Sequence, residues 1–500
     1  MNKYLLLGGA LLAPLGAAAQ HADKPNIIFI LCDDMGYGDL ACYGQPYINT
    51  PNIDRLASEG MRFTQAYAGS PVSAPSRATI MTGQHTGHTH VRGNREYWTG
   101  RPNVQYGKSQ DPDRVGQEPY DPRHIILPEV MKKNGYTTGM FGKWAGGYEG
   151  STSTPDKRGV DEFYGYICQY MAHMYYPNFL NRFSTRAGDK QTVRIELTGN
   201  TKYGTDNADY AHRTQYSGDL IHQEALKWLD EQKPDQPFYG FFTYTLPHAE
   251  LYQPDDSILQ AYKQRFSNDI SFAGIDRYHA NTHMHAQFAA MITRLDAYVG
   301  EIMARLKQRG LDDNTILIFS SDNGPHEEGG ADPTFFGRDG KLRGLKRACY
   351  EGGIRIPFIV RWPGHVKEGS VNDHQLAFYD ILPTFCDLLG HQANDYLNPD
   401  YADDCFDGIS FLPTLLGHDK VQKEHDHLYW EFHETNQMGL RKGNWKLVVR
   451  KGVCELYDLA TDIHEDHNVA ADYPDILNEL KQELLKEHKE SPLFKVTLPK

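Results

Sequence analysis

Two uninterrupted apolar runs stand out along the chain, and each is followed at once by acidic or amide side chains. The first run covers residues 25–32 and precedes an Asp-Asp pair at 33–34. The second covers residues 315–321 and precedes Asp-Asn-Gly at 322–324. A short apolar run without alternation is typical of a strand buried on both faces of a parallel sheet. We therefore expect two central strands with polar groups at their carboxyl ends.

Further strand-like and helical segments alternate along the chain. Residues 136–141, 238–245 and 356–362 are strand-like, while residues 126–134 and 284–309 have apolar positions at helical spacing. This alternation predicts an α/β domain with a large, mostly parallel sheet flanked by helices. In such sheets ligands bind at the carboxyl ends of strands, which is where both acidic pairs are expected.

The pattern changes after about residue 395. A turn-rich segment at 407–413 precedes three short strand-like pieces, and a helix at 474–489 closes the chain. We expect a smaller C-terminal α+β subdomain with a short antiparallel sheet. The predicted division is residues 1–19, 20–400 and 401–500, for a signal peptide, a catalytic domain and the C-terminal subdomain.

The first twenty residues have the pattern of a secretory signal peptide. Lys3 gives a positive start, residues 5–15 are apolar, and three alanines at 17–19 form a small-residue cleavage site. The apolar part is too short to span a bilayer. We expect cleavage after Ala19, export across the inner membrane to the periplasm, and no integral membrane contact.

The net charge of the chain is −14, from 51 basic and 65 acidic residues. This balance disfavours a protein that binds nucleic acid through its phosphates. An acidic protein that handles an anionic substrate must gather its basic side chains at one place.

Asp33, Asp34, Asp322 and Asn323 suggest a metal site. Adjacent carboxylates at a buried strand end repel one another unless a cation neutralises them. Their oxygen donors suit a hard divalent ion, Ca²⁺ or alternatively Mg²⁺. Taken separately, each pair would be an ordinary turn after a strand.

The segment at 73–83, SAPSRATIMTG, could by itself be a turn and a helix start. It also resembles the signature of the type I sulfatases, the formylglycine-dependent family, in its serine version. The first residue of that signature is oxidised after synthesis to an aldehyde, formylglycine, by a maturation enzyme. The resemblance implies that Ser73 is such a precursor and that the fold is like that of alkaline phosphatase.

Other markers of this family occur in order, and the resemblance covers roughly residues 24–490. In the family, these segments supply sulfate-binding side chains and the metal ligands, which include the first signature residue. They are Asp33-Asp34, Gly142-Lys143-Trp144, Pro247-His248, Asp322-Asn323-Gly324, and Lys346 ahead of Glu351-Gly352-Gly353.

The resemblance also implies how the site acts. Arg77, Lys143 and Lys346 would share the charge of the sulfate oxygens with the metal, a Lewis acid. The nucleophile would be one hydroxyl of the hydrated aldehyde derived from Ser73, and Asp322 would accept its proton.

The resemblance assigns the protonation of the departing alcohol to two further side chains. His248, together with Lys346, would protonate the leaving oxygen. The other hydroxyl of the hydrated aldehyde would then expel sulfate, which an ordinary serine could not do.

One position departs from the family pattern. Many members have Gly-Lys-Trp-His where this chain has Ala145, and that histidine helps to regenerate the aldehyde. His85, His88 and His90 follow the signature closely and are candidates for a substitute base. They could instead be polar loop residues, or a zinc site at spacing i, i+3, i+5.

The expected substrate is a sulfated carbohydrate. The resemblance is to exported bacterial glycan sulfatases, arylsulfatase A and N-acetylgalactosamine sulfatases, and favours a galactose or N-acetylgalactosamine sulfate of mucin or glycosaminoglycan. The candidates for holding the sugar are His85, His88, His90, Arg92, Asn94 and His173.

Two other functions are kept open. The chain could be a phosphatase or phosphodiesterase of the same superfamily, with an unmodified Ser73 and two zinc ions. Because of Ala145, it could also be a protein that binds sulfated glycans without catalysis.

Overall fold

A computed structural model gives the fold of most of the chain. It describes residues 24–98, 101–102, 115–204, 206–275, 278–338 and 340–500. The predicted signal peptide, residues 1–19, lies outside the described residues. Among the described helices, none combines the length and the apolar character that a membrane span requires.

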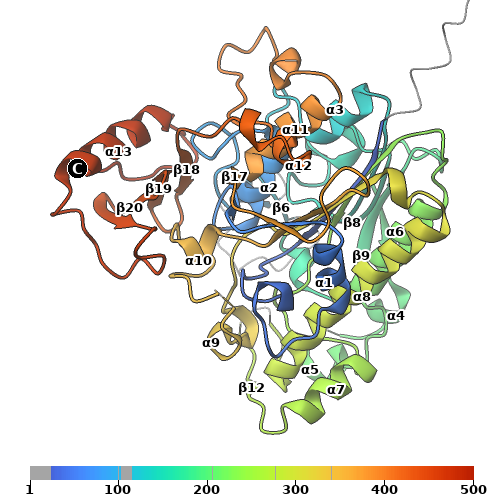
Figure 1. Ribbon diagram of the computed structural model, residues 1–500. Helices are drawn as coiled ribbons and strands as arrows, with labels where there is room; N and C mark the ends of the chain where they lie inside the picture. Colours follow the sequence, from blue (N-terminus) through green and yellow to red (C-terminus); the bar gives the residue numbers. More distant parts are fainter. Residues whose placement is uncertain (1–23, 99–100, 103–114, 205, 276–277, 339) are drawn as a thin grey trace, which may run out of the picture.

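A ten-stranded sheet forms the centre of the larger part of the molecule (Figure 1). Its five middle strands run parallel in the order β8-β7-β11-β1-β14, and β9, β10, β15, β2 and β16 extend it at the two edges. The mostly parallel sheet predicted from the sequence is thus confirmed. The strand bounds are β1 Asn26–Cys32, β2 Met61–Phe63, β7 Thr137–Lys143, β8 Glu162–Tyr166, β9 Phe179–Ser184, β10 Val193–Glu196, β11 Phe238–Thr243, β14 Thr315–Ser321, β15 Phe358–Arg361 and β16 Ser370–Asn372.

Strand β1 shows why these segments lack an alternating pattern. All seven of its residues are buried. Ile28 and Ile30 belong to the apolar core on one face of the sheet, whereas Ile27 and Phe29 belong to the core on the other face. Because both faces are covered, every position of the strand is apolar.

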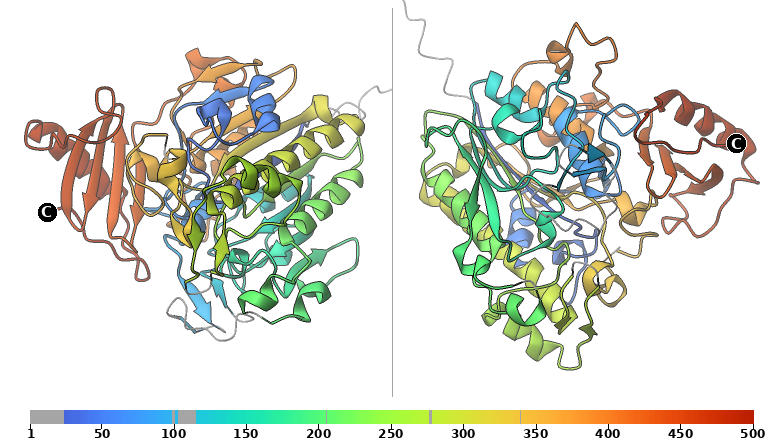
Figure 2. Two further views of the ribbon diagram at one scale, coloured as in Figure 1. Left: turned by 90° about the horizontal axis from the view of Figure 1, so that it is seen from below. Right: turned by 180° about the vertical axis from the view of Figure 1, so that it is seen from behind.

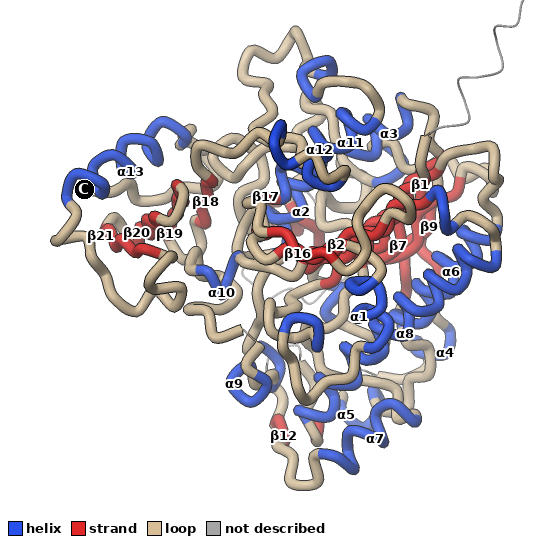
Figure 3. Tube along the Cα trace, in the orientation of Figure 1, coloured by secondary structure: helices blue, strands red, loops and turns tan. Residues whose placement is uncertain are grey.

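Helices cover both faces of the sheet (Figure 3). One layer contains α1, α6 and α8, and the other contains α2, α3 and α11. The helices predicted at 126–134 and 284–309 correspond to α3 and α8. The bounds are α1 Pro51–Ser58, α2 Ser73–Thr82, α3 Leu127–Lys133, α6 Ser217–Asp230, α8 Met284–Gln308 and α11 Ile381–Leu388.

A four-stranded antiparallel sheet and one helix form the C-terminal part, which stands at one side of the molecule in Figure 2. The sheet begins at Leu428, and Leu480 and Leu484 of the helix pack on it. The preceding segment still belongs to the larger part, because Phe411 packs in the core of α2 and α11. The bounds are β18 Leu428–Phe432, β19 Gln437–Lys442, β20 Trp445–Arg450, β21 Val453–Asp458 and α13 Pro474–Glu487.

Smaller elements complete the described chain. They are β3 Ala66–Tyr67, β4 Glu96–Trp98, β5 Arg101–Pro102, β6 Val115–Gln117, β12 Ser271–Phe272, β13 Asn281–Thr282, β17 Leu376–Ala377, α4 Thr198–Thr201, α5 Asn207–Tyr210, α7 Ser257–Arg265, α9 Pro333–Phe336, α10 Glu351–Ile354 and α12 Leu412–Leu415.

The C-terminal sheet is tied to the loop that precedes α10. The fully buried carboxylate of Glu351 accepts hydrogen bonds from Lys446 Nζ at 2.8 Å and from the Tyr67 hydroxyl at 2.7 Å. The backbone N–H of Cys349 donates to Gln437 Oε1 at 3.0 Å. The C-terminal part therefore supports the segment that carries Lys346.

Candidate active site

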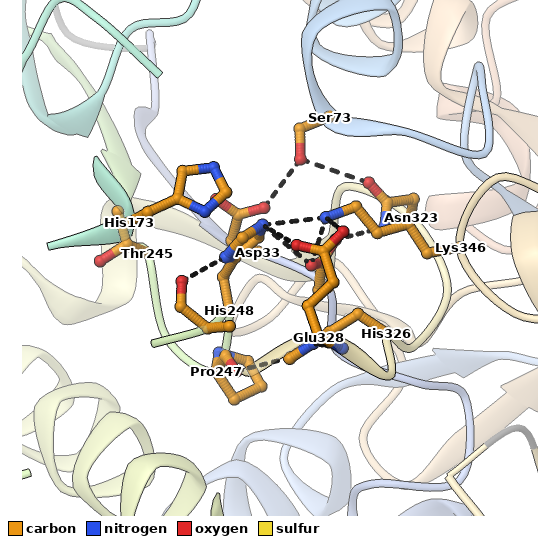
Figure 4. A network of polar contacts seen from close by, with 12 residues as sticks. Asp33, Ser73, His173, Thr245, Pro247, His248, Asn323, His326, Glu328 and Lys346 are labelled. Atoms are coloured by element: carbon orange, nitrogen blue, oxygen red, sulfur yellow. Dashed lines mark hydrogen bonds and ion pairs between the residues drawn. The ribbon is translucent and has the colours of Figure 1, made fainter. Parts of the chain in front are cut away.

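Polar side chains from distant parts of the sequence meet at the carboxyl edge of the parallel strands (Figure 4). This edge is where ligands bind in open α/β sheets. The contributing elements are the ends of β1, β7 and β14, the loop after β11, the first turn of α2, and the loop before α10. Their side chains are Asp33, Asp34, Ser73, Arg77, Lys143, His248, Asp322, Asn323 and Lys346.

The centre of the site is acidic. Asp34 N donates to Asp322 Oδ1 at 3.1 Å, and Asn323 Nδ2 donates to Asp34 Oδ1 at 2.6 Å. Asp33, Asp34, Asp322 and Asn323 are each at most 1% exposed. The sequence therefore predicted the meeting of these two pairs correctly.

Three buried carboxylates at one point form an electrostatically costly arrangement. Burial, with the nearby charge of Asp33, raises the pKa of Asp322 to about 7. Burial also acts on Asp33 and Asp34, but Lys143 next to one and Lys346 next to the other hold both pKa values below their usual range. The donor set consists of oxygens alone, so it fits a hard divalent cation.

Ser73 is the first residue of α2 and is 1% exposed. Its Oγ donates to Asp33 Oδ1 at 2.8 Å and lies 3.4 Å from Asn323 Oδ1. Asp322 was expected to accept the proton of the nucleophile. In this geometry Asp33 is the carboxylate next to Ser73, while the oxygens of Asp322 accept from Asp34 N and Arg77 Nε.

Three cationic groups surround the acidic centre. Arg77 Nε donates to Asp322 Oδ2 at 2.8 Å, Lys143 Nζ to Asp33 Oδ2 at 2.6 Å, and Lys346 Nζ to Asp34 Oδ2 at 2.8 Å. Among the described residues, Arg77 Nη2 is buried, makes no hydrogen bond, and lies 3.6 Å from Asp33 Oδ2. A buried donor of this kind is suited to an anionic oxygen of a substrate.

His248 and Lys346 form a hydrogen-bonded pair. His248 Nδ1 lies 2.5 Å from the carbonyl oxygen of Ala249, and Nε2 lies 2.9 Å from Lys346 Nζ. Burial and the charge of Lys346 lower the pKa of His248. A neutral imidazole therefore donates from Nδ1 and accepts at Nε2, which makes Lys346 the proton-bearing member of the pair.

His173, which we predict to hold the sugar, lies against His248 of this pair. Its ring centroid lies 4.1 Å from that of His248, in a T-shaped arrangement. The side-chain oxygen of Asn94 accepts from Gln169 Nε2 at 2.9 Å, and Gln169 precedes His173 by a few positions in the sequence.

The structure brings neither His85 nor His88 to the site. His85 Nε2 pairs with Glu487 at 3.1 Å, and His88 Nδ1 pairs with Asp407 at 2.8 Å. Both histidines follow the end of α2, whereas Ser73 begins it, and ten helical residues span about 15 Å. The His85 contact joins the larger part of the molecule to α13, whereas Asp407, the partner of His88, precedes the C-terminal sheet.

His90 and Arg92 also have partners elsewhere. His90 Nε2 lies 2.9 Å from Glu118 Oε1, away from His85 and His88, so the three histidines do not form one zinc site. Arg92 is buried and donates to Glu431 Oε1 at 2.9 Å. None of these four residues contacts the acidic centre through any interaction found in the described part of the chain.

Two site residues were not selected from the sequence. His326 is buried beside His248, with ring centroids 5.4 Å apart, and burial lowers its pKa to about 3. Glu328 lies 3.5 Å from Lys346 Nζ. Both follow Asp322-Asn323-Gly324 within a few positions, and that proximity is the signal that could have identified them.

Known proteins resemble this chain in sequence. The family model described as Sulfatase matches residues 25–391, and that described as N-sulphoglucosamine sulphohydrolase, C-terminal, matches residues 344–490. An N-acetylgalactosamine-6-O-sulfatase of Bacteroides thetaiotaomicron is 30% identical and covers 93% of this chain and 93% of its own. An N-acetylgalactosamine-6-sulfatase of Rattus norvegicus is 33% identical over 81% of this chain and 69% of its own.

Solved structures agree in fold. Ps i-CgsB in complex with k-i-k-neocarrahexaose superposes with a TM-score of 0.71 at 26% identity, covering 94% of this chain and 95% of its own. A sulfatase from a Bacteroides thetaiotaomicron locus for the metabolism of multiple glycosaminoglycans has a TM-score of 0.69 at 25% identity, covering 93% of this chain and 99% of its own.

Proposed function

Since this chain belongs to the sulfatase family and is an enzyme of sulfate ester hydrolysis, we propose that its substrate is a glycan bearing an N-acetylgalactosamine or galactose O-sulfate. The observation that carries the sulfate ester in this proposal is the group of buried cations, Arg77, Lys143 and Lys346, around the acidic centre beside Ser73. A sulfate monoester bears its charge on three oxygens, and preorganised cations stabilise the additional charge of the transition state.

The proposed nucleophile derives from Ser73 by oxidation to formylglycine, carried out by a formylglycine-generating enzyme. The hydrated aldehyde supplies one hydroxyl for attack on sulfur and a second for release of sulfate. The position of Ser73 supports this role, because its Oγ lies beside Asp33 and at the amino end of α2. The positive end of the helix dipole favours negative charge there.

We assign Ca²⁺ to the acidic centre, with Mg²⁺ as the alternative. The residues that would hold it are Asp33, Asp34, Asp322 and Asn323, together with the modified side chain at position 73. When bound, such an ion acts as a Lewis acid toward a sulfate oxygen. The carboxylates serve a second purpose, since Asp33 and Asp34 orient Lys143 and Lys346.

Protonation of the leaving alcohol is assigned to Lys346 and His248. Lys346 Nζ donates to His248 Nε2, so a proton given up by Lys346 leaves the pair hydrogen-bonded and ready to be reloaded from solvent. The lysine keeps its proton at neutral pH. Burial lowers its pKa, but Asp34 and Glu328 outweigh burial and bring it to about 12.

The substrate class is inferred from relatives and from the rim of the site. Both curated relatives described above are named for N-acetylgalactosamine 6-sulfate, so the 6-position is the first to test. His173, next to His248, and Asn94, which accepts a hydrogen bond from Gln169, are the residues proposed to meet the sugar. Because residues 1–19 have the pattern of a signal peptide, we place the reaction in the periplasm.

A phosphatase with two zinc ions fits the residues less well. A second zinc ion would need the histidine and carboxylates around His248, but the Lys346 ammonium already lies among them. Its Nζ is 2.8 Å from Asp34 Oδ2, 2.9 Å from His248 Nε2 and 3.5 Å from Glu328 Oε1. Ala145, the reason to consider a non-catalytic binder, is buried and adds no polar group.

A desulfation screen tests the proposed substrate. Matured protein is incubated with 3-, 4- and 6-O-sulfated N-acetylgalactosamine and galactose, with N-acetylglucosamine 6-sulfate, and with the matching phosphate esters, and released anion is quantified. We expect sulfate from an N-acetylgalactosamine or galactose ester, at least about 100-fold faster than from the glucosamine ester, because buried polar groups left unpaired by the wrong epimer cost several kcal/mol. Release from the glucosamine ester alone would refute the sugar assignment, and release of phosphate alone would refute the reaction.

A further inference from the structure

A carboxylate lies beside the leaving-group pair without contacting the metal-binding carboxylates. Glu328 Oε1 is 3.5 Å from Lys346 Nζ, and Oε2 is 3.9 Å from His248 Nε2. Its side chain is 18% exposed, so it lies at the inner wall of the site rather than on the surface. Figure 4 shows Glu328 between Lys346 and His248.

The two oxygens of Glu328 have different partners. Oε1 accepts from Arg347 Nη1 at 2.5 Å, on the same loop as Lys346. Oε2 accepts from the Tyr278 hydroxyl at 2.8 Å, and that hydroxyl is 2.9 Å from His173 Nδ1. A continuous chain of hydrogen bonds therefore runs from Glu328 through Tyr278 to His173.

The donor and the acceptor of each hydrogen bond between Glu328, Tyr278 and His173 follow from the number of protons that each group carries. Burial raises the pKa of Glu328, but the charges of Lys346 and Arg347 outweigh burial and hold the pKa well below its usual range, so the group is a carboxylate. A carboxylate only accepts, and a phenol has a single proton to donate. Tyr278 therefore donates to Glu328, and His173 must donate from Nδ1 to the Tyr278 oxygen. The proton count therefore places a proton on Nδ1 of His173.

We propose that Glu328 is the positioning residue of the leaving-group side. One of its oxygens holds the cationic loop of Lys346 and Arg347, and the other fixes, through Tyr278, the tautomer of His173 beside His248. Glu328 thereby keeps the proton donor Lys346 and the imidazole of His173 in place around the alcohol as it departs. This inference rests on the proposed sulfatase reaction of the site, but not on the identity of the sugar.

The consequence depends on the leaving group. A sugar alcohol is a poor leaving group and needs its proton in the transition state, whereas a nitrophenol departs as an anion with little help. A residue that only positions the proton donor should therefore matter for sugar sulfates and hardly at all for aryl sulfates of acidic phenols.

The test uses Glu328→Gln, which keeps the shape of the side chain and removes its charge. We expect kcat for the sugar sulfate to fall by roughly 100-fold, the low end of what general acid catalysis contributes. For 4-nitrophenyl sulfate we expect a change below about 3-fold, and across aryl sulfates a steeper fall of kcat with increasing phenol pKa, with KM nearly constant. Glu327→Gln, at the exposed neighbouring position, is the matched control.

Two outcomes would overturn the proposal. An equal loss for all leaving groups would indicate a merely structural role, and a rise in KM for the sugar sulfate alone would indicate a sugar contact. A second measurement needs no turnover: ¹⁵N NMR of histidine-labelled protein, with the His173 signal assigned by His173→Asn. We expect the Nδ1–H tautomer in the wild type and its loss in Glu328→Gln and Tyr278→Phe. Finding Nε2–H in the wild type would reject the inference, whereas a wild type that cleaves no sulfate ester would reject the proposed function instead.

Discussion

Replacing Ser73 by alanine is expected to abolish sulfate release, lowering kcat by a factor on the order of 10⁴ or more, as loss of a nucleophile does in other covalent mechanisms. Among the residues that the structure describes, Ser73 is the one whose hydroxyl is hydrogen-bonded to Asp33, at 2.8 Å, and lies at the amino end of α2. The cations that hold the sulfate remain in the variant, so substrate binding should persist. Steady-state sulfate release and calorimetric titration with the sulfated sugar measure the two effects separately.

Two outcomes would contradict the prediction for Ser73→Ala. If the variant keeps more than about one percent of wild-type turnover, the nucleophile is another group, such as a solvent hydroxide, and the covalent route is excluded. If it loses sugar binding as well, the serine is structural. The melting temperature serves as the control for folding, and we expect it to stay within a few degrees, because a buried Ser→Ala change at a satisfied hydroxyl costs about 1 kcal/mol.

The second large effect is expected for Asp34→Asn. Asp34 is fully buried and accepts from Lys346 Nζ at 2.8 Å and from Asn323 Nδ2 at 2.6 Å. Asparagine removes one of three negative charges and gives Lys346 a neutral partner. We expect affinity for Ca²⁺ to fall by about 10- to 100-fold, because ligand charge sets the affinity of such sites, and kcat/KM to fall by about 100- to 1,000-fold.

Calorimetric titration of chelator-treated protein with Ca²⁺ measures the first effect directly, without turnover. Asp373→Asn, at an exposed position remote from the site, is the matched control and should leave both quantities unchanged. Unaltered Ca²⁺ affinity in Asp34→Asn would show that the acidic centre does not hold the ion.

The parts of the fold that the sequence predicted are those in which burial dictates residue type. Strand β1 is apolar at every position because both of its faces are covered, and its run therefore stood out. Strand β19 was missed, since Gln437–Lys442 contains one glycine and several polar residues and has no apolar run. Gly439 lies against Trp430 and Cys349, contacts that only the assembled C-terminal sheet creates.

The candidate site likewise contains residues that the sequence predicted correctly and residues that it did not. Asp33, Asp322, Lys143 and Lys346 were found from motifs, and parallel strands that end at one edge made their meeting a reasonable inference. His85 and His88 are of a residue type equally suited to the site, but α2 separates them from Ser73, and their partners are Glu487 of α13 and Asp407.

Glu328, in contrast, did not stand out in the sequence although it belongs to the site. An acidic residue in a loop is common, and its contacts with Tyr278 and Arg347 come from segments far apart in the sequence. Its position after Asp322-Asn323-Gly324 indicates that Glu328 lies near the site, but its pairings depend on the tertiary structure.

The most direct test of the central claim is the mass of the tryptic peptide 63–77, which carries Ser73, from protein made in cells that contain a formylglycine-generating enzyme. We expect this peptide to be lighter than the encoded sequence by two hydrogen atoms, and the modified fraction to rise in proportion to the specific sulfate-releasing activity across preparations. An unmodified serine in a preparation that releases sulfate at the full rate would contradict the assignment of Ser73 as the precursor of the nucleophile.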